Sequence, residues 1–202
     1  MRPEALVRGA LRQHLLDPMA GPCEFVDELW VPRTNERADL AVLARSMDGF
    51  EIKTSTDNLR RLQRQADAYA RIFDHCTVVA APNHVSGVAE ILPDWWGVMT
   101  VRVGDRVTFD SARPAAPNPS IDVEVLVRLL WRDEVLSALK ALGTEPDAKA
   151  TRGRLWTQLL EGTTVARLRS IVRRALLGRD PKSARIATRR ITAQLASASA
   201  VR

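Results

Sequence analysis

The sequence predicts an α/β protein in which a mixed central sheet is flanked by helices, with a helical unit after it. Strand-length apolar runs alternate with segments of helical periodicity over the first half of the chain, and this β-α-β order is typical of mixed sheets. A proline-rich stretch, SARPAAPNPS, then interrupts the pattern, as expected of a linker. Beyond this stretch, the long apolar segments have helical periodicity.

The first expected elements are one helix and three strands. The helix covers residues 3–16, because Pro3 is favourable in a first helical turn. The strands are expected near residues 24–31, 38–44 and 49–54. The residues MDG at 47–49 are a turn signal, so the second and third strands should form a hairpin around them.

The next expected elements alternate between helix and strand. Residues 57–74 should form a helix, with Ser55 or Thr56 as its N-cap and apolar side chains at helical spacing. A strand over 76–81 and a helix after Pro82 should follow. A last pair of strands, GVMTVRV and RVTFD, is joined by a Gly-Asp pair, which is a hairpin signature.

We expect three parts in the chain. Residues 1–112 should hold the sheet, residues 113–120 a Pro-rich linker, and residues 121–202 a basic helical region. The last part contains two long periodic segments that end at Gly143 and Gly178. Glycine is common just past the end of a helix.

Two acidic residues and a lysine carry the strongest chemical signal. Alternate side chains of a strand share a face, so Glu51 and Lys53 should point to one side of the sheet and Ile52 to the other. If the preceding strand is an antiparallel neighbour, Asp39 can lie beside Glu51. Neighbouring carboxylates repel each other unless a cation compensates them, and Mg²⁺ or Mn²⁺ prefers such oxygen ligands. The simpler alternative is a solvated face of a half-exposed strand.

Other polar residues could join this group. Arg61, Gln65 and Tyr69 are spaced four apart on the expected helix and therefore share one of its faces. The alternative is a helix face that packs on the sheet. For a further metal ligand, the sequence offers Glu4 in the first helix or Glu28 at the end of the first strand. Either could instead be an ordinary surface acid, since acids favour the first turn of a helix.

The motif residues, taken in order, resemble a known family. An aspartate, then Glu-Ile-Lys on a strand, then Gln-x-x-x-Tyr on the next helix is similar to the PD-(D/E)XK nuclease superfamily and its RecB-like members. Strings such as GFEIKTSTDNLRRLQRQADAYARIFDHCTVVAAPNH and PDWWGVM resemble a largely uncharacterised bacterial group within it. One departure is Ala38, which stands where many members have proline.

The resemblance implies a restriction-endonuclease-like core and a nuclease that uses Mg²⁺ or Mn²⁺. It implies Lys53 as the catalytic lysine, while the residues of the helix contact the substrate or hold the site in place. The implied metal ligands are Asp39, Glu51, the backbone carbonyl of Ile52, and Glu4 or Glu28. The implied catalytic residues are Asp39, Glu51, Lys53, Gln65 and Tyr69.

Basic charge is concentrated near the C-terminal end. Residues 1–145 hold 17 Lys and Arg against 21 Asp and Glu, whereas residues 146–202 hold 13 against 3. Clustered basic residues gain affinity for nucleic acid by releasing counterions from its phosphates, although an arginine-rich helix can also be simply solvated. The arginines expected to contact nucleic acid are Arg61, Arg152, Arg154, Arg167, Arg169, Arg173 and Arg174.

Together these features predict a bacterial hydrolase, a DNA-binding and metal-binding endonuclease that cleaves phosphodiester bonds. DNA repair or defence against phages and mobile elements would be its setting, and RNA is not excluded as a substrate. The alternative is a non-cleaving nucleic-acid-binding or partner-docking protein on a nuclease fold. A homodimer and a complex with a partner protein are both compatible with the sequence.

The expected compartment is the cytoplasm. The chain has only two cysteines and no apolar segment at its N-terminus, which argues against secretion and a disulfide framework. It contains no run of about 18 apolar residues, so no membrane-spanning helix is expected.

Overall fold

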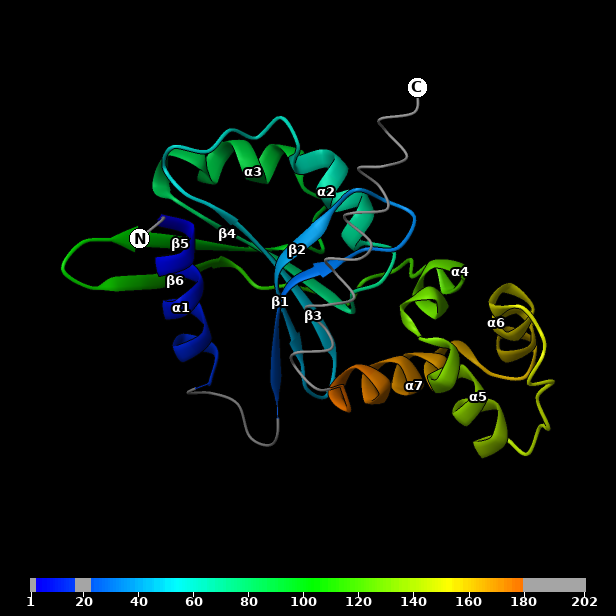
Figure 1. Cartoon of the computed structure of the whole chain (residues 1–202). Helices are drawn as coiled ribbons and strands as arrows, with labels where there is room; N and C mark the ends of the chain where they lie inside the picture. Colours follow the sequence, from blue (N-terminus) through cyan, green and yellow to red (C-terminus); the bar gives the residue numbers. More distant parts are fainter. Residues whose placement is uncertain (1–2, 17–22, 180–202) are drawn as a thin grey trace, which may run out of the picture.

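The computed structural model describes residues 3–16 and 23–179. Its centre is a six-stranded sheet in which every strand neighbours the next one along the chain (Figure 1). The first three strands are antiparallel, β3 pairs with β4 and β4 with β5 in parallel, and β5 and β6 form an antiparallel hairpin. The strands are β1 Glu24–Trp30, β2 Arg37–Leu43, β3 Met47–Lys53, β4 His75–Ala80, β5 Gly97–Val103 and β6 Val107–Arg113.

Helices cover both faces of this sheet. Val7 and Leu11 of α1 (Pro3–Leu16) pack on one face, and α2 (Leu62–Tyr69) and α3 (Val85–Ile91) pack on the other (Figure 1). A short 3-10 turn, η1 (Pro82–His84), precedes α3. The expected mixed α/β architecture is therefore confirmed.

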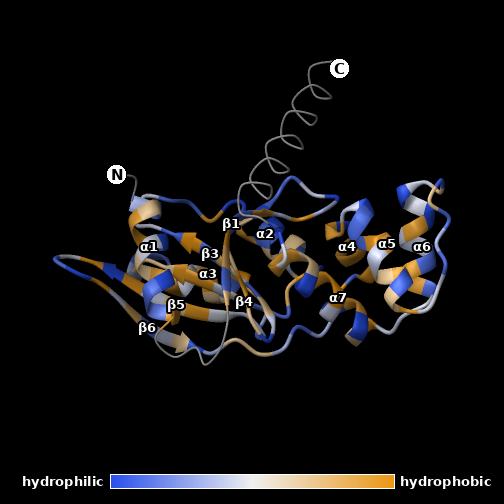
Figure 2. Ribbon diagram, turned by 60° about the horizontal axis from the view of Figure 1, so that its bottom comes forward, coloured by the Kyte–Doolittle hydropathy of each residue, from blue (hydrophilic) through white to orange (hydrophobic). Residues whose placement is uncertain are grey.

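The C-terminal part is helical as far as it is described. Its elements are α4 (Val123–Leu126), η2 (Val127–Leu129), α5 (Arg132–Ala141), α6 (Arg152–Glu161) and α7 (Val165–Leu177). Figure 2 shows that α5, α6 and α7 each carry hydrophobic and hydrophilic residues, as expected of helices with one buried side. Within the described ranges, no helix has the length and hydrophobicity needed to cross a membrane.

Two local expectations are wrong. The β2–β3 turn lies at 44–46, where the Ala44 amide donates to the Ser46 carbonyl at 3.0 Å, so the residues at 47–49 belong to β3. The helix expected over 57–74 begins at Leu62. The reason is that Asp57 accepts hydrogen bonds from the backbone and hydroxyl of Thr54, at 2.7 and 2.6 Å. These bonds close a turn after β3 instead of starting a helix.

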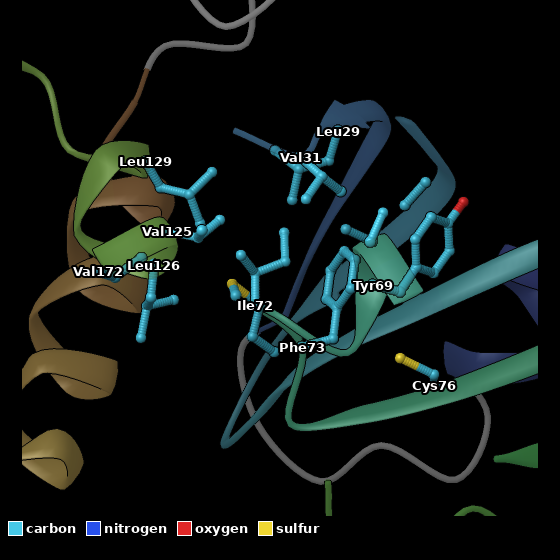
Figure 3. Close-up of a cluster of buried hydrophobic side chains, with 14 of the residues drawn as sticks. Leu29, Val31, Tyr69, Ile72, Phe73, Cys76, Val125, Leu126, Leu129 and Val172 are labelled. Atoms are coloured by element: carbon cyan, nitrogen blue, oxygen red, sulfur yellow. The ribbon is translucent and has the colours of Figure 1, made fainter. Parts of the chain in front are cut away.

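One apolar core continues from the sheet into the C-terminal helices. Figure 3 shows this junction, with Ile72 and Phe73 on one side and Val125, Leu126 and Leu129 on the other, all buried. Burying such side chains stabilises by about 1.5–3 kcal/mol each.

The segment expected to be a linker is held against this body. The side-chain amide of Asn118 donates to the carbonyls of Ala70 and Phe73, at 2.7 Å each. Its backbone N–H donates to the Asp74 carbonyl at 2.8 Å. The division into a sheet domain, a linker and a basic region stays a prediction.

Candidate functional site

Four of the expected site residues form one buried hydrogen-bonded group between β3 and α2. The Lys53 ammonium donates to the Glu51 carboxylate at 2.6 Å and to the Gln65 side-chain oxygen at 2.9 Å. The Tyr69 hydroxyl contacts the second Glu51 oxygen and donates to the Arg37 carbonyl at 2.8 Å. Strand alternation puts Glu51 and Lys53 on the α2 side, while Ile52 packs in the core under α1.

Burial controls the protonation of this group. Only 1% of Glu51 is exposed, and burial raises the pKa of its carboxyl, against the opposing effect of Lys53 and of the hydrogen bonds. Burial and the nearby carboxylates also raise the pKa of Tyr69 well above its ordinary value. The tyrosine therefore stays protonated, and its single O–H proton lies between the Arg37 carbonyl and the Glu51 carboxylate, which compete for it.

Asp39 lies at the edge of this group and belongs to a second, acidic one. Its carboxylate accepts a hydrogen bond of 2.7 Å from the Ile52 amide. Burial, then repulsion from Glu51, raises the pKa of Asp39 to about 8. Carboxylate oxygens of Glu4, Glu28 and Asp39 all lie within 4.8 Å of one another. A divalent cation would relieve this crowding, since carboxylate oxygens are its preferred ligands.

The acidic group already has a cationic partner in Arg8. Its guanidinium bridges Glu4 at 3.2 Å and Glu28 at 3.1 Å, and it donates to the Asp39 carbonyl at 3.2 Å. Glu28 has a positive φ of 53°, an uncommon conformation for a residue other than glycine. The two acids that the sequence offered as alternatives thus lie together with Asp39.

Arg61, which the sequence predicts to contact nucleic acid, instead pairs with an acid of the protein itself. Arg61 and Arg64 bind the buried carboxylate of Glu36, at 2.8 and 2.6 Å. Burial alone would raise the pKa of Glu36, but the hydrogen bonds from the two arginines outweigh it and lower that pKa. The sequence carried no signal for Glu36, whereas Arg8 could have been found from its spacing of four residues after Glu4.

Two arginines of α7 also face inward. Arg169 binds the carboxylate of Asp74, which is only 7% exposed, and Arg173 donates to the Arg45 carbonyl. Both contacts tie α7 to the sheet. Arg167 and Arg174 are exposed and line a groove between α5 and α7.

Arg152 and Arg154 remain as exposed residues of α6. In the part of the chain that the structure describes, neither forms an ion pair with an acid. The Arg152 guanidinium lies 5.8 Å from the ring centre of Trp156, and Arg128 lies 4.7 Å from the same ring. Two guanidinium groups thus lie over the indole, and of these Arg128 also pairs with Glu124 at 3.6 Å.

Comparison with known proteins gives one family. A family model described as bacteriophage P4 protein cII matches residues 2–199. A curated relative, "Protein cII" of Enterobacteria phage P4, is 33% identical over 81 residues. That match covers 40% of this chain and 31% of the relative. No solved structure matches.

These findings overturn the nuclease predictions. The matching family model and the relative are both described as phage P4 cII proteins, not as PD-(D/E)XK nucleases. The predicted resemblance, the nuclease or hydrolase activity and the assignment as an enzyme are therefore wrong. The motif misled because an Asp, a Glu-x-Lys strand and a polar helix face also serve structural ends, here a buried ion-pair network.

Proposed function

Because this chain belongs to the bacteriophage P4 protein cII family, we propose that it is a DNA-binding protein that does not cleave DNA. Its role would be regulatory, in the genetic programme of a phage or a phage-derived element. The family membership supports the phage setting, and the basic charge of the C-terminal part supports DNA as the ligand.

The observation that carries the proposal is the unpaired basic surface of α6. Lys149, just before the helix, and Arg152 and Arg154 within it are exposed, and none of their side chains forms an ion pair with an acid among the described residues. Leu155 and Leu159 on the opposite side are buried, so the helix is anchored while its basic side faces solvent. Phosphate contacts of this kind provide most of the affinity for nucleic acid.

Helix geometry adds to this surface. Thr151 caps α6 by accepting from the Arg154 amide at 3.3 Å, and the positive end of the helix dipole lies beside these basic side chains. The stacking of Arg152 on Trp156 limits the positions that its guanidinium can adopt. We therefore expect Arg152 to make the most defined phosphate contact.

The test is fluorescence anisotropy with labelled duplex DNA over a series of salt concentrations. The double variant Arg152→Glu and Arg154→Glu should weaken binding by about tenfold or more and reduce the salt slope by about 2, roughly one for each lost phosphate contact. Arg106→Glu is the matched control, because Arg106 is exposed in the β5–β6 turn, far along the chain from α6. Equal losses in both proteins would contradict the proposal.

The same DNA should be recovered intact after incubation with Mg²⁺ or Mn²⁺. Single-stranded RNA, included as a competitor, tests whether the ligand is DNA in particular. If RNA competes more strongly than unlabelled DNA, RNA and not DNA is the preferred ligand.

We also propose a Mg²⁺ or Mn²⁺ site at Glu4, Glu28 and Asp39. The donor set fits such an ion, because three carboxylates from α1, β1 and β2 converge within 4.8 Å and burial and charge repulsion raise the pKa of Asp39. Glu51 is less suited to direct ligation, since both its oxygens already have donors. A bound cation would add positive charge to that of Arg8, which already pairs with Glu4 and Glu28. Mg²⁺ should raise the melting temperature of the wild type but not of Asp39→Asn.

For the architecture alone, we propose a restriction-endonuclease-like core, supported by the antiparallel-then-parallel order of β1 to β5. DNA binding would take place in the bacterial cytoplasm.

A further inference from the structure

A groove of about 460 Å³ separates α5 from α7. Its apolar lining includes Ala138 of α5, Ile171 of α7, and Leu142 just after α5. Ala138 is buried, but Leu142 and Ile171 keep part of their surface exposed. The middle of the groove is therefore apolar and open to solvent.

The two helices that line the groove are joined at one pair of ends. Arg179, just after α7, binds Glu134 at the start of α5 at 2.7 Å and stacks on Trp131 at 4.1 Å. The end of α7 thus meets the beginning of α5. Asp133 and Arg167 both line the groove, and this orientation puts them at opposite ends.

The charges at the two ends are uncompensated. Asp133 and Arg167 are exposed, and within residues 3–16 and 23–179 neither forms an ion pair. Arg174 also lines the groove and lies between Ile171 and the end of α7, toward Asp133. The groove thus has charges of both signs at the Asp133 end, an apolar middle and a basic end at Arg167. A two-fold rotation through the middle would bring Asp133 of one copy onto Arg167 of another.

We propose that this face of α5 and α7 binds a second copy of the chain in a two-fold symmetric dimer. Each Asp133 would pair with Arg167 of the second copy, so the contact occurs twice. The two Ile171 side chains would meet near the symmetry axis and be buried there. The result is a four-helix layer of α5 and α7 from both copies, packed as helix pairs pack in bundles.

Charge argues against DNA as the occupant of this groove. Asp133 and Glu134 line one end and would repel phosphates, so Arg167 and Arg174 do not form a purely basic surface. Among the described residues, the exposed arginines of α6 form no ion pair with an acid. The dimer proposal is thus independent of where DNA binds.

The test is sedimentation of the full chain over a wide range of concentration. Wild type should be in equilibrium between monomer and dimer. Asp133→Arg and Arg167→Asp, each made alone, should raise the dissociation constant of the dimer by about tenfold or more, because like charges then face each other twice. The double variant restores opposite charges and should regain most of the affinity.

Lys140→Glu is the control, since Lys140 is exposed on α5 and does not line the groove. Circular dichroism checks that each variant is folded. If one single variant does not fold, the other is enough for the test. A wild type that stays monomeric at all concentrations overturns the proposal. So do single variants that dimerise like wild type, or a double variant that does not recover. A monomer whose DNA affinity falls in Arg167→Asp would assign the groove to DNA instead.

Discussion

Replacing Lys53 by methionine is the sharpest test of how the buried polar group is stabilised. The Lys53 side chain is 9% exposed and that of Glu51 is 2% exposed. Methionine keeps much of the volume but removes the ammonium that lies 2.6 Å from the Glu51 carboxylate. The carboxylate then keeps the contact with the Tyr69 hydroxyl but loses its only paired charge in the described structure.

The magnitude follows from burial. Removing one member of a buried ion pair costs about 3–5 kcal/mol, because the other charge is left without compensation. We therefore expect Lys53→Met to lose about 3–5 kcal/mol of unfolding free energy at neutral pH. A second substitution, Glu51→Gln, removes the charge as well. The double variant should be within about 1 kcal/mol of wild type, since a neutral pair needs no charge compensation.

The loss in Lys53→Met should depend on pH. Burial holds the pKa of Glu51 above its ordinary value of 4.5, and loss of the ammonium raises that pKa further. Above pH 4.5 the folded protein then binds more protons at this site than the unfolded chain does, so stability falls as pH rises. The penalty should therefore shrink toward acidic pH, where Glu51 is protonated.

The assay is urea unfolding followed by circular dichroism, for wild type, Lys53→Met and the double variant. A single variant that loses less than about 1 kcal/mol at neutral pH would refute the reasoning. It would mean that water reaches Glu51 or that the carboxyl is already neutral.

Three other perturbations test separate contacts. The pKa of Asp39 is raised from 3.8 to about 8, so without divalent cations the unfolding free energy of the wild type should fall as the pH rises from 3.8 to about 8. Urea unfolding at several pH values should show a smaller fall for Asp39→Asn. Gly49→Ala should cost about 1–3 kcal/mol in urea, because the added Cβ would lie 2.6 Å from the Phe73 ring; an unchanged midpoint would mean that the ring moves freely. Arg169→Met should cost about 2 kcal/mol, less than for a fully buried pair because the arginine is partly exposed. Its partner Asp74 is left buried, and a further change to Asn at position 74 should recover stability.

Local patterns in the sequence predicted much of the candidate site. Strand periodicity placed Glu51 and Lys53 on one face, and helical spacing put Gln65 and Tyr69 together on α2. The structure brings these four side chains into one network. The same patterns could not tell a catalytic site from a structural network, because both use the same residues at the same spacing.

The sequence by itself determined the order of strands and helices, the amphipathic faces and the concentration of basic charge near the C-terminal end. Each of these depends on residues close together in the chain. The tertiary structure decided which arginines are available: Arg169 pairs with Asp74 across 95 positions, and Arg61 with Glu36 across 25. Such pairs form because a buried carboxylate requires a nearby cation, and only the fold determines which cation is near.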